Sequence, residues 1–331
     1  MRCWLLHVAT LLLSVTQAPL LLPLFSLLPS PTTWFGRLLS VALFTGIDVL
    51  IADCLSRIAA TGASYTSRLH ISPRQSRAWQ PVSVAAVYLF NPFTILSCLA
   101  RPTTVITTFF TILSIDQACQ AQAITTAFAL ALAGYTSLHP AILLPVVGML
   151  CYDRLAIAQE NSQSSVRTEK EIHGPASTGD LATDQRNRPN ILAFALTHVT
   201  IFILFSATLL GLSRLLLPSW QFVPSIYLTL LQLPDLTPNP GLWWYFFIEM
   251  FDAFRSFFLG VFWLHMLAYS VPFCLRFQKQ PLAAVILMMG VIAVFEPYAN
   301  IGDVGAWLSC MCLLGHTFEC EYLPTVSLAL R

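Results

Sequence analysis

Residues 233–265, LPDLTPNPGLWWYFFIEMFDAFRSFFLGVFWLH, decide how the rest of the sequence is interpreted. The stretch opens with three prolines, Pro234, Pro238 and Pro240. Because proline has no backbone N–H and disfavours helix in the residue before it, residues 233–241 cannot form a helix interior. Three amphipathic rings follow directly, at Trp243, Trp244 and Tyr245. Such rings gather at membrane–water interfaces, so the helix that follows is expected to start at an interface.

Three charged side chains lie inside the helix predicted from this stretch. Glu249 and Asp252 are three residues apart, as are Asp252 and Arg255, so all three are expected along one stripe of the helix surface. Charges at membrane depth are costly and usually face protein, water or a ligand head group. This stripe is therefore the strongest candidate for a functional site.

The composition places the chain in a membrane. Of its 331 residues, 56% are hydrophobic and only 10% are charged, whereas roughly 25% are charged in an ordinary soluble domain. The mean hydropathy of +0.70 points the same way. A net charge of +1 gives no indication of nucleic-acid binding. The 9 cysteines show no zinc-site spacing with histidine, so no metal site and no cofactor is predicted.

The apolar segments predict an all-α integral membrane protein. We expect one polytopic helical bundle over residues 1–331, with roughly seven to nine membrane segments. The expected segments are 37–60, 81–100, 103–115, 122–138, 139–152, 191–217, 251–273, 282–295 and one that begins at 303. Residues 153–190 are hydrophilic and are interpreted as a flexible cytoplasmic loop.

The basic residues predict the orientation of the bundle. They gather in residues 68–77, 154–188 and 276–279, which the positive-inside rule places in the cytoplasm. The segments between them then put residues 217–242 and 296–303 on the opposite, lumenal side. The charged stripe would face the lumen at its N-terminal end.

Two charges in the first long segment are expected to pair. Asp53 and Arg57 are four residues apart and so lie on one helix face. The pair is either a packing contact between helices or a contact with a substrate head group, since charges inside membranes normally find partners.

Two polar residues elsewhere stand directly before prolines. Asn91 precedes Pro92, which breaks the helix there, so Asn91 is either part of a structural kink or a donor that lines a cavity. His139 precedes Pro140 and is interpreted as a helix cap rather than a ligand.

Residues 234–258 closely resemble the PIG-U family, the multi-spanning subunit of the GPI transamidase. The matching pattern is P-D-L-T-P-N-x-G-L-W-W-Y-F-F-x-E-M-F-D-x-F-x-x-F-F. Further blocks that are similar to the family are residues 88–100 (YLFNPFTILSCLA), 135–145 and 297–304 (PYANIGDV). The family resembles the multi-spanning mannosyltransferases, so the resemblance implies a GT-C-like membrane domain.

The resemblance also implies a function, a location and partners. It implies a non-catalytic subunit of the GPI transamidase complex, multi-pass in the endoplasmic reticulum membrane. Such a subunit binds the GPI lipid, holds the complex together during attachment of GPI anchors to proteins, or does both. The implied partners are the other transamidase subunits, including the catalytic cysteine protease-like subunit, and the GPI glycolipid.

A GPI-binding groove is expected near the charged stripe. An apolar groove for acyl chains and polar groups for the head group suit a phosphoinositol glycolipid. The candidate lipid-binding residues are Asn91, Phe247, Glu249, Phe251, Asp252, Phe254, Arg255 and Phe258, with Phe257 beside them. The alternative is that the aromatic rings pack between helices, as aromatic rings at helical spacing often do.

No catalytic residue is predicted. The sequence contains neither G-x-S-x-G nor H-E-x-x-H, and Cys274 and His265 have no evident third residue to orient them. The alternative function is a dolichol-phosphate-mannose-dependent mannosyltransferase of GPI biosynthesis. That enzyme needs an acidic residue in its first lumenal loop, whereas the first acidic residue here is Asp48, inside a predicted helix. A transporter would show inverted repeats, and none is found.

Both ends of the chain depart from the family. A first helix and a lumenal loop are expected before the segment that begins at Gln17, and several further helices after residue 307. The chain is therefore expected to be truncated at both ends.

Overall fold

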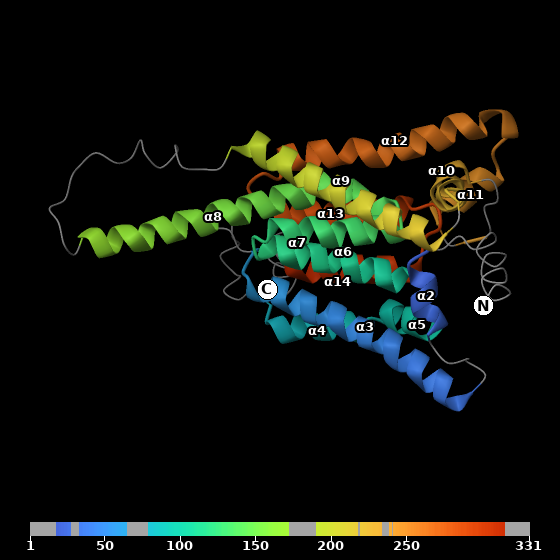
Figure 1. Cartoon of the computed structure of the whole chain (residues 1–331), viewed down its shortest axis with the longest axis horizontal. Coiled ribbons are helices and arrows are strands. Elements are labelled where there is room, and N and C mark those ends of the chain that lie inside the picture. The colour runs from blue at the N-terminus through green and yellow to red at the C-terminus, as the bar shows by residue number, and fades with distance from the viewer. Residues whose placement is uncertain are drawn as a thin grey trace, which may run out of the picture.

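The computed structural model is helical in the part of the chain that it describes, residues 18–27, 33–64, 79–171, 190–217, 219–233, 238–239 and 241–314 (Figure 1). No β-strand occurs within those ranges. The elements are α2 Leu21–Ser26, α3 Trp34–Ala60, α4 Pro81–Leu89, α5 Pro92–Ala100, α6 Thr104–Cys119, α7 Ala123–Thr136, η1 His139–Leu143, α8 Leu144–Glu171, α9 Ile191–Leu216, η3 Pro224–Leu228, α10 Thr229–Gln232, α11 Leu242–Ile248, α12 Asp252–Arg276, α13 Pro281–Phe295, α14 Ile301–Met311 and η4 Cys312–Leu314.

Several of these helices are long and apolar enough to cross a membrane. Within the described residues they number 4, namely α3, His139–Ser162, α9 and α12, or 5 if the bent pair α4–α5 counts as one span. At 1.5 Å per residue, such helices match the ~30 Å hydrocarbon core of a bilayer. This confirms an all-α chain with membrane-length helices. The larger number of membrane segments and the GT-C-like arrangement stay predictions.

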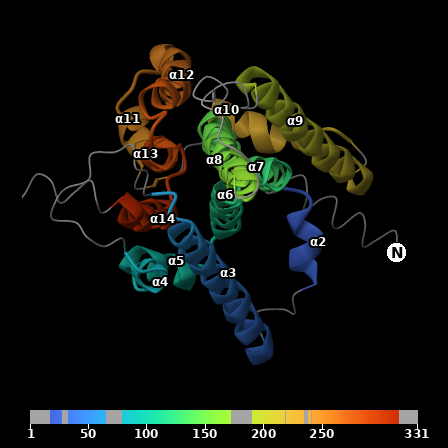
Figure 2. The ribbon, with the colours of Figure 1, turned by 90° about the vertical axis from the view of Figure 1, so that its left-hand side faces the viewer.

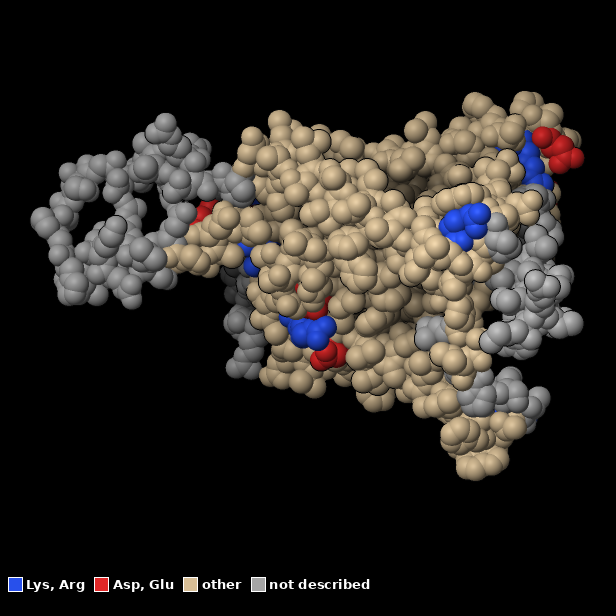
Figure 3. Space-filling view, in the orientation of Figure 1, with Lys and Arg blue, Asp and Glu red and all other residues tan. Residues whose placement is uncertain are grey.

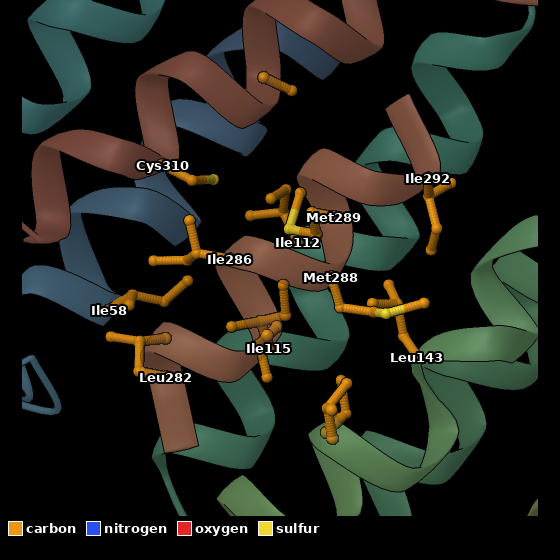
Figure 4. Packing of buried hydrophobic residues seen from close by; sticks show 14 of the residues in the cluster. Ile58, Ile112, Ile115, Leu143, Leu282, Ile286, Met288, Met289, Ile292 and Cys310 are labelled. Atoms are coloured by element: carbon orange, nitrogen blue, oxygen red, sulfur yellow. The ribbon is translucent and has the colours of Figure 1, made fainter. Parts of the chain in front are cut away.

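Shorter apolar helices lie between the long ones and form the centre of the bundle (Figure 2). The most completely buried of them is α13, which packs against α8, α12 and α14. A helix that is apolar all round belongs in an interior, because it has no polar face to present. Figure 4 shows α13 side chains meeting residues from α3, α6, η1 and α14; the labelled residues are Ile58, Ile112, Ile115, Leu143, Leu282, Ile286, Met288, Met289, Ile292 and Cys310.

A glycine sets the closest approach between α13 and α14. A Cβ atom placed on Gly290 would lie 2.5 Å from the indole ring of Trp307, a distance that atoms do not adopt. The two helices therefore pack closely only because this position carries no side chain.

The broken segment is bent at the position that the sequence predicts. Helices α4 and α5 meet at an angle of 53°, and the break falls at Phe90 and Asn91. The Asn91 side chain caps α5 by accepting a hydrogen bond from the Phe93 N–H at 3.0 Å. Pro92 occupies the first helical position, where a missing N–H leaves no bond unmade.

Two helices extend further than the sequence indicated. Helix α8 continues to Glu171, so the first part of the stretch 153–190 is helical and not a loop. Residues 155–160 are mostly strong helix formers, and the first Gly-Pro pair comes only at Gly174. The remainder, 172–189, lies outside the described residues. Helix α12 likewise contains Pro272 and ends four residues later at Arg276.

The connections gather at two opposite ends of the bundle (Figure 1). The C-terminal ends of α3, α8 and α12 lie at one end. The connection from α9 to α12 and the connection from α13 to α14 lie at the other end. Arginines lie at both ends, however: Arg57 and Arg276 in the last turns of α3 and α12, and Arg214 in the last turn of α9, at the opposite end. The cytoplasmic or lumenal orientation therefore stays a prediction.

Candidate functional site

The predicted charged stripe does not exist as one helix face. Helix α11 ends at Ile248, Glu249 caps it, and α12 starts only at Asp252. The i,i+3 spacing therefore spans a break rather than a turn of helix, which corrects the predicted geometry. Asp252 instead stands in the first turn of α12, where a carboxylate favourably faces the positive end of the helix dipole.

The three charges lie at one end of the molecule rather than in its interior. Figure 3 shows acidic and basic side chains together at the end where α12 begins. Glu249 and Asp252 are exposed, whereas Arg255 is half-buried. Arg255 donates a hydrogen bond to the backbone carbonyl of Leu233, 2.6 Å away. Its guanidinium thus attaches α12 to the end of α10, which is a structural role that the sequence alone did not reveal.

The aromatic residues of this stretch divide into two sets. The inward set is Trp243, Phe246, Phe247, Phe258 and Phe262, whose rings stack or meet edge to face with centroids 4.9–5.7 Å apart. Such contacts add to the hydrophobic effect of burial. Phe247 and Phe258, two of the predicted lipid-binding residues, are therefore packing residues.

The outward set is Phe251, Phe254 and Phe257. Their exposed fractions are 79%, 57% and 65%, so their rings are largely free of the rest of the described chain. Phe251 lies in the break between α11 and α12, and the other two follow on the first turns of α12. They form an apolar surface directly beside the exposed carboxylates of Glu249 and Asp252. We call these three rings the outward phenylalanines.

Trp243 is one of the three aromatic rings expected at a membrane interface, but it lies inside the bundle. It is fully buried, and its indole N–H donates to the backbone carbonyl of Phe295, which connects α11 to the end of α13. Tyr245, two residues on, is exposed. Burial of Trp243 could not be inferred locally, because its partner lies far along the chain.

Asn91 is a structural link between helices. Besides capping α5, its side-chain amide donates to the Gly305 carbonyl at 3.1 Å and to the Ser309 hydroxyl at 3.1 Å, both on α14. The structure thus favours the kink interpretation and adds a tie to α14 that the sequence did not predict.

This arrangement predicts a loss of stability on substitution of Asn91. We expect Asn91→Ala to lower the free energy of unfolding by about 2 kcal/mol, from one lost cap and two lost hydrogen bonds. Asn91→Ser keeps a capping oxygen and should recover roughly half of that loss. Thermal unfolding of the full chain in detergent measures both. Unchanged unfolding with reduced GPI binding would contradict the structural role and support a ligand contact.

Arg57 pairs with two carboxylates. Its guanidinium lies 2.8 Å from Asp53 on the same helix, which confirms the predicted pair, and 2.9 Å from Asp116 on α6. The packing interpretation is therefore the one that the structure supports. Asp116 is completely buried and also accepts from the amide of Gln120 at 2.9 Å.

A cavity with several polar side chains in its lining lies elsewhere, between α6, η1, α13 and α14. It has a volume of about 70 Å³ and is lined in part by His139, Glu296 and Asp303. His139 is buried, its ring stacks on Trp263, and its Nδ1 lies 3.4 Å from Glu296. Interpreting His139 as a helix cap was wrong, because its side chain lines this cavity and caps no helix.

The sequence carried only a weak signal for this cavity. Glu296 directly precedes the block 297–304, Asp303 lies within that block, and His139 lies in the block 135–145. No local pattern predicts that these three side chains meet. Burial, and secondarily the charge of Asp303, raise the pKa of Glu296 well above its usual range. Within the described ranges, no three His, Cys, Asp or Glu side chains gather closely enough to hold a metal ion.

Comparison with known proteins gives a consistent result. The sequence model of the family described as GPI transamidase subunit PIG-U matches residues 13–330. The GPI-anchor transamidase component PIGU of Homo sapiens is 31% identical over 239 residues, which is 72% of this chain and 49% of the human protein. The GPI transamidase component GAB1 of Saccharomyces cerevisiae is 30% identical over 317 residues, which is 95% of this chain and 66% of the yeast protein. The matched region thus spans about half of the human relative.

Proposed function

Because the chain belongs to the PIG-U family of GPI transamidase subunits, we propose that it is a non-catalytic subunit of that complex in the endoplasmic reticulum membrane. There it binds the GPI lipid and helps to hold the complex together while GPI anchors are attached to proteins. Its partners in this proposal are the other transamidase subunits, including the catalytic cysteine protease-like subunit.

One observation supports lipid binding at the start of α12. The outward phenylalanines present apolar rings beside the exposed carboxylates of Glu249 and Asp252. A glycolipid has acyl chains that pack on apolar rings and a polar head that hydrogen-bonds to charged groups. The half-buried Arg255 beside them can approach a phosphate, which guanidinium groups bind well. This surface therefore matches both parts of a GPI molecule.

The experiment replaces the outward phenylalanines together by alanine in the full chain, expressed in cells that lack the native copy. The transamidase complex is then purified by its partner subunits, and the bound GPI is quantified. We expect the complex to assemble and to retain GPI about tenfold less well, because about 1.4 kcal/mol of apolar contact is lost. A GPI-anchored reporter at the cell surface should fall in parallel.

A matched control replaces Leu264, Val271 and Leu275 by alanine. These residues are also exposed and apolar but lie further along α12. They should leave GPI retention unchanged. Equal GPI retention in the two triple variants would contradict lipid binding at this surface. Loss of assembly in the phenylalanine variant alone would show that a partner subunit, and not the lipid, covers these rings.

The mannosyltransferase alternative gains no support. The similar proteins are named as components of the transamidase and not as mannosyltransferases. The non-catalytic role itself is part of the proposal. Variants of this chain should not change the rate at which the purified complex transfers GPI that is already bound, and measuring that rate tests the role.

A further inference from the structure

The cavity between α6, η1, α13 and α14 has a mostly apolar lining into which a group of polar side chains is set. Four threonines of α6 face it together with the ionisable side chains of three other elements; the polar lining residues are Thr104, Thr107, Thr108, Thr111, Ser137, His139, Glu296 and Asp303. The volume of about 70 Å³ corresponds to a group of a few non-hydrogen atoms, since one water occupies about 30 Å³.

Three of the four threonine hydroxyls present oxygen acceptors to this space rather than hydrogens. Thr107 donates its hydrogen to the hydroxyl of Thr136 at 2.9 Å, and Thr111 donates to the backbone carbonyl of Thr107 at 2.8 Å. Thr108 donates to a carboxylate oxygen of Asp303 at 2.7 Å. A hydroxyl has one hydrogen and two acceptor sites, so what these oxygens still offer is acceptance.

His139 adds a further unused acceptor. Its Nδ1 faces the Glu296 carboxyl group at 3.4 Å and the Ser137 hydroxyl at 3.2 Å; when Glu296 is ionised, this geometry favours the tautomer with the hydrogen on Nδ1. The ring is 1% exposed, and its Nε2 has no hydrogen-bond partner among the described residues. A buried nitrogen without a partner is costly, so the site is incomplete as it stands.

The two carboxylates also lack a cationic side chain. Within the described ranges, no lysine or arginine forms an ion pair with Glu296 or Asp303. Buried carboxylates are normally paired with a cation, because an isolated buried charge is strongly unfavourable. The polar part of the lining, made of carboxyl groups, hydroxyl oxygens and a bare imidazole nitrogen, is complementary to a small cation that carries several N–H donors, and the apolar part suits a short aliphatic chain.

We propose that this cavity binds a primary ammonium group on a short aliphatic chain. Such a group has three N–H donors and no acceptor, which matches the unused capacity of the lining. Burial raises the pKa of Glu296 and of Asp303 and so favours their neutral forms; a bound ammonium would favour the ionised carboxylates through charge-assisted hydrogen bonds. A quaternary ammonium has no N–H donor and is bulkier, so it would not satisfy the site. The inference does not depend on whether the outward phenylalanines bind GPI.

A primary ammonium can come from a soluble amine or from a phosphoethanolamine head group, and the test separates them. The full chain is placed in phosphatidylcholine nanodiscs, and its thermal unfolding is followed while ethylammonium is added; choline is the matched control. A second series replaces phosphatidylcholine stepwise by phosphatidylethanolamine. A ligand that binds only the folded state raises the unfolding midpoint in a saturable manner. A rise with ethylammonium identifies a soluble amine, and a rise only with phosphatidylethanolamine identifies the lipid.

Variants locate the effect in the cavity. Glu296→Gln and Asp303→Asn remove one negative charge each and should weaken ammonium binding about tenfold, or about 1.4 kcal/mol. Asp53→Asn removes an exposed carboxylate that lies outside the cavity and should leave the response unchanged.

Three outcomes would overturn the proposal. One is the absence of a saturable rise in both series, which would leave water as the occupant. Another is an equal rise of the unfolding midpoint with choline and with ethylammonium. This comparison uses the unaltered sequence, so it does not depend on whether a variant folds. The third is undiminished binding in both Glu296→Gln and Asp303→Asn.

Discussion

Arg57→Leu is expected to lower the free energy of unfolding by about 3–5 kcal/mol, because it leaves a buried carboxylate without its cation. The carboxylate is that of Asp116, which is 0% exposed and lies 2.9 Å from the guanidinium. The amides of Gln117 and Gln120 also donate to Asp116, but they carry no charge. The measurement is thermal or denaturant unfolding of the full chain in detergent.

The same arginine provides the control. Asp53 lies 2.8 Å from Arg57, but its side chain is 54% exposed. Asp53→Asn should therefore cost less than about 1 kcal/mol, as exposed ion pairs usually do. The double variant Arg57→Leu, Asp116→Leu removes the buried carboxylate together with its cation and should recover most of the lost stability. Equal losses from Arg57→Leu and Asp53→Asn would contradict the burial argument.

Trp243→Ala is expected to be comparably severe. The ring is 0% exposed and makes aromatic contacts with Phe247, Phe262 and Trp263. Removing a buried tryptophan costs about 3–5 kcal/mol, from lost apolar burial and from the cavity that remains. The lost indole N–H also leaves the Phe295 carbonyl without this donor. The loss should appear as a lower unfolding midpoint and as reduced yield of the folded chain.

Two further variants separate the contributions of this residue. Trp243→Phe keeps an aromatic ring but removes the donor, and it should cost about 1–3 kcal/mol. Tyr245→Ala alters an exposed ring two positions away and should change stability by about 0.5 kcal/mol or less. If Trp243→Ala were as mild as Tyr245→Ala, the packing of α11 against α12 and α13 would be wrong.

Local chemistry made several features of this chain predictable. The break at Asn91 follows from the proline after it, and the Asp53–Arg57 pair follows from the periodicity of one helix. Helices α3 and α9 begin and end close to the predicted residues, because long apolar segments have a strong length signal. The candidate lipid surface was only half predictable, since spacing alone could not tell outward Phe251 from inward Phe247.

The sequence by itself determined the membrane class, the order of the helices and the family, because these depend on composition and on neighbours along the chain. Only the tertiary structure decided which polar groups meet. It brings Asp116 to Arg57, and it gathers His139, Glu296 and Asp303 around one cavity. The first contact depends on the packing of α6 against α3, and the second on the meeting of α6, η1, α13 and α14. Local periodicity encodes neither.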